Sequence, residues 1–351
     1  MPPGSPFGRR LRATLRGLSP GYFAAVMATG IISTGLQDDG RIVLSRVLLA
    51  LGVVAFVGLL VLNAWRVAFF RAELVEDFTH PLRGFGFYTF VAAADVLAAR
   101  IADRRPSEAL WLLVVAAVCW LLRGYAVPWT TRLGADEHPI VAAANGSWFM
   151  WAVGGQSIAV AAAVLAHSHS GQALPAVAVA AWCLGVFLYA VDGVFVAMRL
   201  LAYDFSAEDL TPPYWVAMGA AAITALAGAE ITLLPAGPVL DVAREGVRAG
   251  SLFAWVLATW LLPALFAMGW WRHITHRVPL RYDANLWSIV FPLGMYAVAS
   301  TRLGAIDGLD VLTDVGRVWV WIALAAWLLT TAAGTAHVVR RLLLADPRGE
   351  A

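Results

Sequence analysis

The feature that most constrains this chain is a series of ten long apolar runs, separated by short polar connections. The hydrocarbon core of a bilayer is about 30 Å thick, so a helix needs about 20 apolar residues to cross it. Lipid offers no partners for backbone polar groups, and a helix satisfies those groups within one such run. The sequence therefore predicts membrane-spanning helices over 18–36, 42–70, 81–101, 108–127, 139–166, 174–201, 213–234, 251–271, 284–299 and 315–339.

The composition supports this fold class, an all-α polytopic membrane protein. Of the 351 residues, 60% are hydrophobic and 14% are charged, whereas soluble domains average about 45–50% apolar and about 25% charged residues. The connections between the runs are too short to hold a sizeable soluble domain. We expect a basic cytoplasmic segment over 1–17, a single ten-helix transmembrane domain over 18–340 and a cytoplasmic tail over 341–351.

The charges predict an orientation and exclude one class of partner. Cytoplasmic connections carry the excess of basic residues in membrane proteins, and a cytoplasmic N-terminus places most of the arginines on that side. Ten spans then put both termini in the cytoplasm, with the chain in the plasma (inner) membrane. The net charge of +2 and the lack of a basic stripe argue against nucleic acid. The expected partners are the lipid bilayer and a small solute.

Alternate runs begin with similar motifs, which indicates a repeat. A proline opens the first, third, fifth and seventh runs, at Ser19-Pro20, His80-Pro81, His138-Pro139 and Thr211-Pro212. The ninth run departs from this pattern, because it opens with Tyr282-Asp283 and carries Pro292 inside. Proline is also common at the first turn of any helix. The spacing of about 60–70 residues nevertheless favours five helical hairpins in series.

The odd-numbered runs combine internal glycines with aromatic residues, whereas the even-numbered runs are bulkier and apolar on all sides. This difference predicts five odd-numbered helices around an axis, with five even-numbered helices outside them. Glycine either lets helices approach closely or leaves a lumen open, and both explanations remain. The positive ends of the inner helix dipoles would favour anions at the cytoplasmic mouth. The predicted pore-lining residues are Gly30, Gly86, Gly146, Gly154, Gly219 and Gly294.

Three motifs together resemble the tellurite-resistance/dicarboxylate transporter (TDT) family. They are Ser19-Pro20-Gly21-Tyr22-Phe23, His80-Pro81-Leu82-Arg83 and Trp287-Ser288-Ile289-Val290-Phe291-Pro292. That family includes bacterial TehA, malate permeases, sulfite exporters and plant guard-cell slow anion channels, and the resemblance covers nearly the whole chain. It implies five helical hairpins in a quasi-fivefold arrangement, a central pore lined by the odd-numbered helices, and a homotrimer.

The resemblance also implies a gate, because the family has a Phe on its ninth helix that plugs the pore. Phe291 matches that Phe, since it precedes Pro292 on the ninth span. Proline interrupts the hydrogen bonding of a helix and redirects neighbouring side chains, and an aromatic ring can close a narrow apolar constriction. A second explanation stays open, in which Phe291 faces lipid or the core like most of the 16 Phe residues.

Three carboxylates lie within the predicted spans, where a charge is costly and usually faces the bundle interior or a cavity. We expect Asp95 to pair with Arg100 near the end of its span, and Asp192 to have a structural or interfacial role. Glu230 lies on an odd-numbered span and is the candidate for proton coupling, since an ionised carboxylate would repel an anion. Neutral polar residues in these spans either donate to a passing anion or bond neighbouring helices; they are Thr29, Ser33, Asn145, Ser147 and Gln156.

The predicted function is transport of small anions, either a C4-dicarboxylate such as malate or inorganic anions, through a Phe-gated central pore. The alternatives are a proton-coupled dicarboxylate carrier and a sulfite or tellurite exporter. An intramembrane enzyme is remote, because the sequence lacks His-Glu-x-x-His, Gly-x-Gly-Asp and Gly-x-Ser-x-Gly motifs. His167-x-His169 and His273-x-x-His276 lack further ligands at metal spacing, so we predict no metal, no cofactor and no enzymatic activity.

Overall fold

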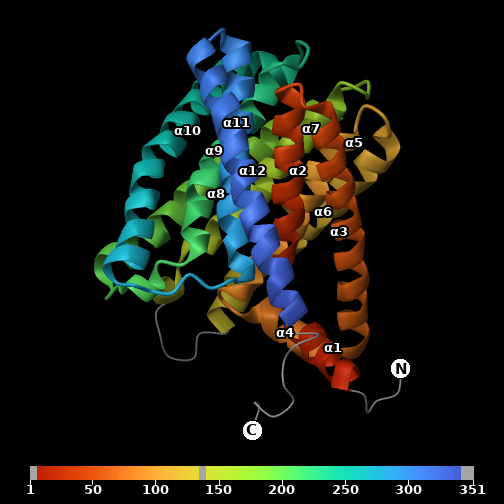
Figure 1. Cartoon of the computed structure of the whole chain (residues 1–351). Coiled ribbons are helices and arrows are strands. Elements are labelled where there is room, and N and C mark those ends of the chain that lie inside the picture. Colours follow the sequence, from red (N-terminus) through yellow and green to blue (C-terminus); the bar gives the residue numbers. More distant parts are fainter. Residues whose placement is uncertain (1–5, 134–139, 341–351) are drawn as a thin grey trace.

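The computed structural model describes residues 6–133 and 140–340, and all regular structure in those ranges is helical. The predicted tail over 341–351 and the His138-Pro139 motif lie outside the described residues. Twelve α-helices follow one another along the chain (Figure 1). They are α1 (Pro6–Arg16), α2 (Phe23–Asp38), α3 (Ile42–Phe69), α4 (Arg71–Thr79), α5 (Tyr88–Ile101), α6 (Pro106–Leu133), α7 (Met150–Ala166), α8 (Ala173–Ala202), α9 (Val216–Thr232), α10 (Pro238–Trp270), α11 (Trp287–Asp307) and α12 (Asp310–Val339).

Nine helical segments in the described ranges are long and apolar enough to cross a membrane. They comprise α3 and every helix from α5 to α12, some of them together with an adjoining short turn of helix. The first predicted span corresponds to α2, which has 16 residues and is not among these nine segments. The chain is therefore a multi-pass helical membrane protein, as its apolar runs predict.

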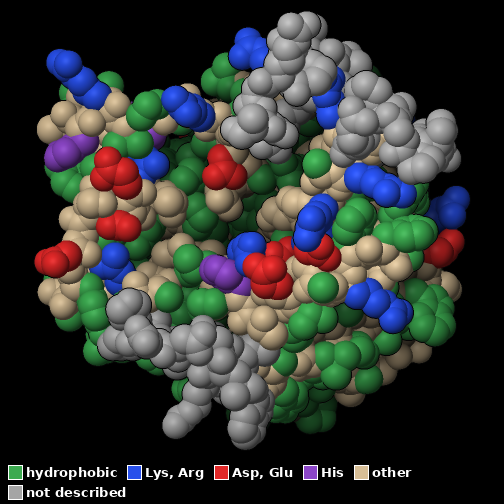
Figure 2. All heavy atoms as spheres, turned by 90° about the horizontal axis from the view of Figure 1, so that it is seen from below, with side chains coloured by type: hydrophobic (Ala, Val, Ile, Leu, Met, Phe, Trp, Pro, Cys, Tyr) green, Lys and Arg blue, Asp and Glu red, His purple; other side chains and the backbone are tan. Residues whose placement is uncertain are grey.

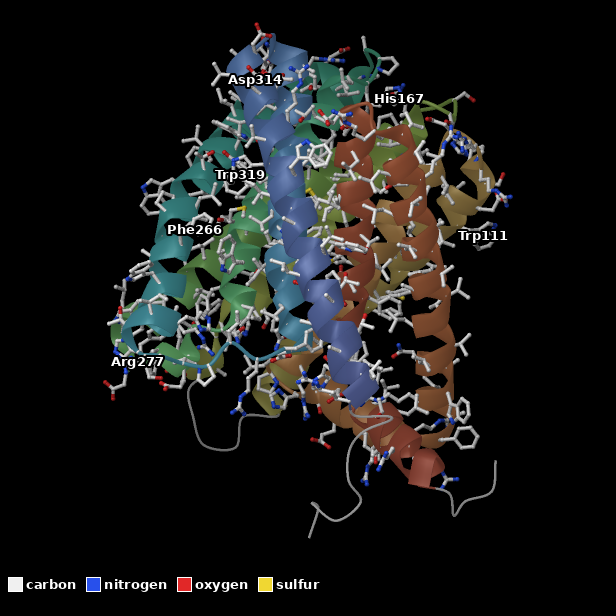
Figure 3. The ribbon with its side chains drawn as sticks, viewed as in Figure 1. Trp111, His167, Phe266, Arg277, Asp314 and Trp319 are labelled. Atoms are coloured by element: carbon white, nitrogen blue, oxygen red, sulfur yellow. The ribbon has the colours of Figure 1, made fainter. Side chains whose placement is uncertain are left out.

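The spans fall into two groups that differ in burial. In α5, α7, α9 and α11, between 67% and 83% of the most apolar stretch is buried inside the protein. In α3, α6, α8, α10 and α12, the buried share is between 17% and 39%. Large apolar side chains on this second group, such as Trp111 and Phe266, point outward (Figure 3). The second group therefore presents its apolar side chains to lipid, and the first group forms the interior.

The interior helices contact one another in a closed order. α2 contacts α5, α5 contacts α7, α7 contacts α9, α9 contacts α11, and α11 returns to α2. Each outer helix packs on the inner helix that precedes it and also contacts the next inner helix of the ring. We call α2, α5, α7, α9 and α11 the inner ring. The alternation predicted from glycine content thus corresponds to an inner and an outer layer.

Each inner helix begins with a short 3-10 turn, and these turns explain the repeated motifs. The five turns are Pro20–Tyr22, Arg83–Phe87, Gly146–Phe149, Pro212–Trp215 and Ala284–Leu286. Each contacts the next, and the fifth contacts the first. Side chains just before three of the turns cap them by accepting backbone N–H groups, namely Ser19, Asn145 and Asp283. All five inner helices therefore start at the same end of the molecule, which we call the turn end.

The turn end is closed on one side by α1 and α4, which lie near each other at the base of the bundle, where α12 also ends (Figure 1). A buried ion pair fixes α4, because a guanidinium nitrogen of Arg66 on α3 lies 2.5 Å from Asp77 Oδ2 on α4. Arg83 lies 3.1 Å from the other oxygen of Asp77. Arg16, at the end of α1, pairs with Glu73 of α4.

Several helix ends extend beyond the predicted spans, mainly at the opposite end of the molecule, which we call the far end. α10 begins at Pro238 rather than near 251, and α11 continues to Asp307 rather than ending near 299. Charged side chains on these extensions pair with each other, as Arg248 Nε does with Asp307 at 2.7 Å. Apolar runs locate the part of a helix that lies in lipid. The polar turns that extend the helix beyond the lipid are not apolar, so this pattern does not predict them.

Candidate functional site: a cavity on the axis of the inner ring and a second cavity at the turn end

The far end of the inner ring encloses a cavity of about 310 Å³. All five inner helices line this far cavity, each with residues spaced three or four apart, which places them on one helix face. The stripe on α11 is Met295, Val298 and Arg302, and the stripe on α9 is Ile223, Leu226 and Glu230. The cavity therefore lies on the axis of the ring.

Charged and polar side chains form the rim of the far cavity. Arg302 on α11 makes a bidentate pair with Asp38 at the end of α2, with distances of 2.9 and 3.0 Å. Glu230 lies 3.8 Å from the same guanidinium. Arg100 on α5 donates to Gln37 at 2.6 Å and to Ser45 at 3.0 Å, and within the described part of the chain it pairs with no carboxylate.

The floor of the far cavity contains a buried carboxylate. Asp95 on α5 and Ser157 on α7 both line the cavity, and Ser157 Oγ lies 2.7 Å from Asp95 Oδ2. The prediction that Asp95 pairs with Arg100 is wrong. Residues three or four apart share a helix face, whereas five residues turn Arg100 away from Asp95 toward α2 and α3. The partner of Asp95 is a hydroxyl group on the neighbouring helix.

Phe291 lies one helical turn below this floor. It precedes Met295 by four residues, so it lies on the same face of α11 as the residues that line the far cavity. The side chain is fully buried, with 0% of its surface exposed. Stepping each cavity stripe one turn deeper gives a layer with one residue from each inner helix, all of them buried: Met27, Ala92, Val153, Gly219 and Phe291. We call these five residues the Phe291 layer.

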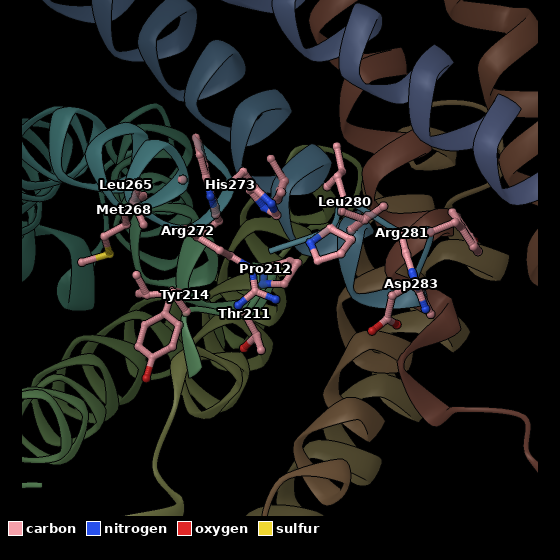
Figure 4. A pocket seen from close by; sticks show the side chains of 18 of the residues that line it. Thr211, Pro212, Tyr214, Leu265, Met268, Arg272, His273, Leu280, Arg281 and Asp283 are labelled. Atoms are coloured by element: carbon pink, nitrogen blue, oxygen red, sulfur yellow. The ribbon is translucent and has the colours of Figure 1, made fainter. Parts of the chain in front are cut away.

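A second cavity, of about 680 Å³, opens at the turn end. Seen from this end, charged side chains surround a hollow whose deeper atoms are hydrophobic (Figure 2). Figure 4 shows Arg272 and His273 beside Thr211 and Pro212, and Arg272 donates to the carbonyl oxygen of Ala207 at 2.7 Å. On α11 and the turn before it, Leu286 and Ile289 line this cavity.

The turn-end cavity is lined by charged side chains and by a hydrogen-bond donor. Its lining has two arginines, Arg272 and Arg281, against one carboxylate, Asp283, so its wall has a net positive charge that can attract anions. Burial raises the pKa of Tyr282, another lining residue, because the charged phenolate is poorly solvated there. Tyr282 therefore stays neutral near pH 7 and can donate a hydrogen bond. Residue spacing did not predict this cavity, because loop residues 279–283 and the helix ends that form it are far apart in the sequence.

The six glycines predicted to line a pore lie at close contacts with neighbouring helices or turns. A Cβ on Gly30 would come 2.5 Å from Val96, one on Gly219 would come 2.8 Å from Pro292, and one on Gly294 would come 2.9 Å from Ile31. At the turn end, Gly86 faces the backbone of Gly21. The remaining two face a backbone and a side chain, with Gly146 against Pro213 and Tyr214, and Gly154 against Trp120. Of the six, Gly219 also belongs to the Phe291 layer.

Most of the other polar residues within the spans bond neighbouring helices. Gln156 donates to the carbonyl oxygen of Trp182, and Trp327 donates to Thr29. Ser33 bonds Ser45. Asp192 is buried on the outer helix α8 and lines neither of the two cavities. Interhelical hydrogen bonding, one of the two explanations given for Thr29, Ser33 and Gln156, is therefore what the structure contains.

Comparison with known proteins now adds to this geometry. A profile of the SLAC1 family, described as voltage-dependent anion channel, matches residues 17–335. The chain belongs to this family. The match covers the inner ring, the outer helices and both cavities, and it confirms the resemblance to the TDT family that the sequence motifs indicated.

Curated proteins of a bacterium and an archaeon are similar to this chain. An uncharacterized membrane protein of Mycobacterium tuberculosis is 48% identical over 153 residues, which are 44% of this chain and 78% of that protein. An uncharacterized transporter of Methanocaldococcus jannaschii is 23% identical over 330 residues, covering 90% of this chain and 92% of its own. A second one from the same organism is 21% identical over 332 residues, covering 91% and 94%. These names and the family indicate a transporter rather than an enzyme.

Proposed function

We propose that this protein conducts small anions across the plasma membrane along the axis of the inner ring, and that Phe291 closes the path. The observation that carries the proposal is the position of Phe291 on α11. Ile289 lines the turn-end cavity and Met295 lines the far cavity, and Phe291 lies between them along α11, on the helix face that lines the far cavity. Six residues of helix correspond to about 9 Å, so a short plug separates two wide cavities.

The electrostatics support an anion as the solute. All five inner helices point their N-termini toward the turn end, where their dipoles place partial positive charge. Arginine and histidine side chains line the turn-end cavity. The Phe291 layer offers no charged group, so selection there depends on width and on weak interactions that release the ion again.

The arrangement proposed for the whole protein has ten spans, with α2 as the first, in quasi-fivefold order around the path. The closed contacts of the inner ring and the similar turns that begin its helices support it. Three such chains would form a homotrimer through the apolar outer helices. The substrate is a small anion, and C4-dicarboxylates such as malate, sulfite, tellurite and other inorganic anions are the classes to test.

The test measures anion flux into proteoliposomes for the wild type and for Phe291→Ala. Removing the ring takes away the plug, and each decrease of about 1.4 kcal/mol in a barrier raises a rate about tenfold. We expect at least such an increase for nitrate, chloride or malate. Phe56→Ala is the matched control, because Phe56 is also buried but lies on the outer helix α3 and lines neither cavity.

Unchanged anion flux in a well-folded Phe291→Ala protein would contradict the assignment of Phe291 as the gate. An equal increase in Phe56→Ala would mean that a core cavity, rather than an open path, admits the ion. If a proton gradient drives malate uptake and the Phe291 variant is slower than the wild type, the protein is instead a proton-coupled dicarboxylate carrier, the second candidate function.

A further inference from the structure

Asp95 at the floor of the far cavity is a buried carboxylate to which the path described so far gives no role. Its side chain is 1% exposed, and one turn below it lies the apolar Phe291 layer. The other residues of the same floor on α2, α9 and α11 are Ile31, Ile223 and Met295. Asp95 Oδ1 is buried and has no hydrogen-bond partner. An ion that leaves the Phe291 layer for the far cavity meets this group first.

No cation neutralises Asp95 within ion-pair distance in the described part of the chain. The charged and titratable groups that face the cavity lie nearer its rim: Arg100 on α5, Asp103 just after α5, His167 just after α7, Glu230 on α9, Arg302 on α11, and Asp38 on α2, which binds Arg302. From α6, Arg123 donates to Gly84 at the turn end, and Cys119 is half-buried. From α3, Arg46 is exposed and Arg66 pairs with Asp77 at the turn end.

These charged groups make the far cavity unfavourable for an anion when every carboxylate is ionised. At the rim, two arginines stand against three carboxylates, and Asp95 would add a fourth negative charge on the path. Coulombic repulsion between like charges is strong where water is scarce. A single proton on Asp95 removes that charge from the floor of the cavity.

The two short contacts of Ser157 at the floor each receive a proton when Asp95 is protonated. Ser157 Oγ lies 2.7 Å from Asp95 Oδ2 and 2.8 Å from the carbonyl oxygen of Gly154. A hydroxyl group has one proton to donate and lone pairs to accept, so it cannot donate fully to both oxygens. A protonated Asp95 would donate to Ser157, and Ser157 would donate to Gly154, which gives each of these contacts its own proton.

We propose that Asp95 and Ser157 form a proton-binding site on the anion path, and that anions pass when Asp95 is protonated. The inference rests on the proposed function and adds a second control to the gate at Phe291. An ionised Asp95 repels the anion, and a neutral carboxyl lets it pass. Anion flux therefore increases as the pH at the far cavity falls.

The experiment uses proteoliposomes of Phe291→Ala, whose open path gives a measurable signal, and compares them with Phe291→Ala/Asp95→Asn. Nitrate is the probe, because it does not itself titrate near neutral pH. The same pH is set on both sides, so that the orientation of the protein does not matter. Above its midpoint a single proton site empties about tenfold per pH unit, so we expect flux through Phe291→Ala to fall with that steepness and flux through the double variant to stay nearly constant.

Three further variants in the Phe291→Ala background complete the design. Asp192→Asn removes an equally buried carboxylate outside the path and keeps the pH dependence. Glu230→Gln also keeps it, because Glu230 lies beside Arg302. Ser157→Ala moves the midpoint to higher pH, because an ionised carboxylate loses more from the missing hydroxyl than a neutral one does.

The outcomes separate this inference from the function on which it rests. If Phe291→Ala carries no anion, the proposed function fails. If it carries nitrate and Asp95→Asn leaves the pH profile unchanged, the proton site fails while the function stands. If Glu230→Gln flattens the profile and Asp95→Asn does not, the proton-binding group is Glu230 and the assignment to Asp95 is overturned. If Asp95→Asn does not fold, the direction of the shift in Ser157→Ala decides.

Discussion

Single glycines of this chain differ in what surrounds them, and this difference determines the cost of replacing them. Gly146 lies in the 3-10 turn before α7, where an added Cβ would meet the backbone of Pro213 and Tyr214. Gly58 lies on the outer helix α3, and a Cβ there would meet nothing within 4 Å. Gly146 is therefore needed for the close contact between two of the 3-10 turns, whereas Gly58 has open space around it.

Gly146→Ala is therefore expected to destabilise the protein by about 1–3 kcal/mol, because a backbone cannot move aside as a flexible side chain can. The apparent melting temperature in detergent should fall. Gly58→Ala should leave it unchanged or raise it slightly, since alanine favours a helix over glycine by about 1 kcal/mol. Equal melting temperatures for Gly146→Ala and the wild type would show that the contact between the turns Gly146–Phe149 and Pro212–Trp215 tolerates the added methyl group.

The sequence singles out Phe291, because its place before Pro292 matches the family motif, and its role as a gate stays a prediction. Along α11 it lies between residues that line the two cavities. The partner of Asp95 could not be found in the same way. Ser157 is 62 positions away along the chain, and nothing in either local sequence indicates that α5 and α7 place them together.

At the scale of elements, α4 shows how a short helix is held at the turn end. Asp77 is buried and contacts two guanidinium groups, Arg66 at 2.5 Å and Arg83 at 3.1 Å. The adjacent Glu76 pairs with Arg83 from an exposed position, with 67% of its side chain accessible. Two neighbouring carboxylates therefore make ion pairs of similar geometry in very different surroundings.

We expect Asp77→Asn to destabilise the protein by about 3–5 kcal/mol, because it leaves Arg66 buried without a counter-charge. Glu76→Gln should cost about 0–1 kcal/mol, because water screens an exposed pair. Thermal unfolding in detergent measures both. Similar small losses in the two variants would mean that water reaches Arg66 and that the pair does not anchor α4.

The helices themselves were predictable wherever lipid dictates the sequence. The run over 42–70 became α3, Ile42–Phe69, with nearly the same bounds. α10 was predicted to begin near 251, but its first turns contain Asp241, Arg244 and Arg248, which an apolar pattern excludes. Arg244 donates to the carbonyl oxygens of Thr232 and Leu234, so those polar turns satisfy the end of α9.

At the scale of the whole molecule, the ring of entry turns gives the protein two distinct ends. α1, α4 and the end of α12 lie at the turn end (Figure 1), and His167 and Asp314 lie at the other (Figure 3). The layering of inner and outer helices followed from side-chain size along the sequence. The orientation of these ends in the membrane depends on the distribution of arginines, which favours a cytoplasmic turn end.

Labelling of single cysteines tests this orientation. The native cysteines, Cys119 and Cys183, lie in α6 and α8 and can be replaced by alanine. Ser168 is exposed at the far end, and Asp204 is exposed at the turn end. In intact cells a membrane-impermeant maleimide should label Ser168→Cys, and it should label Asp204→Cys only after permeabilisation. The reverse pattern would place the turn end outside the cell.

The closure of the inner ring has a consequence for how the chain is made. α2 is the first helix of the inner ring to leave the ribosome, yet two of its contacts come from α11 and α12: Trp327 with Thr29, and Arg302 with Asp38, which is 264 residues earlier. Until α11 and α12 have been inserted, one side of α2 lacks the helices that pack on it in the folded protein, and Asp38 lacks its ion-pair partner Arg302. The first helices to be synthesised are therefore the last to gain all their contacts. A chain that stalls before α11 leaves the inner ring open on one side and does not form a smaller closed ring.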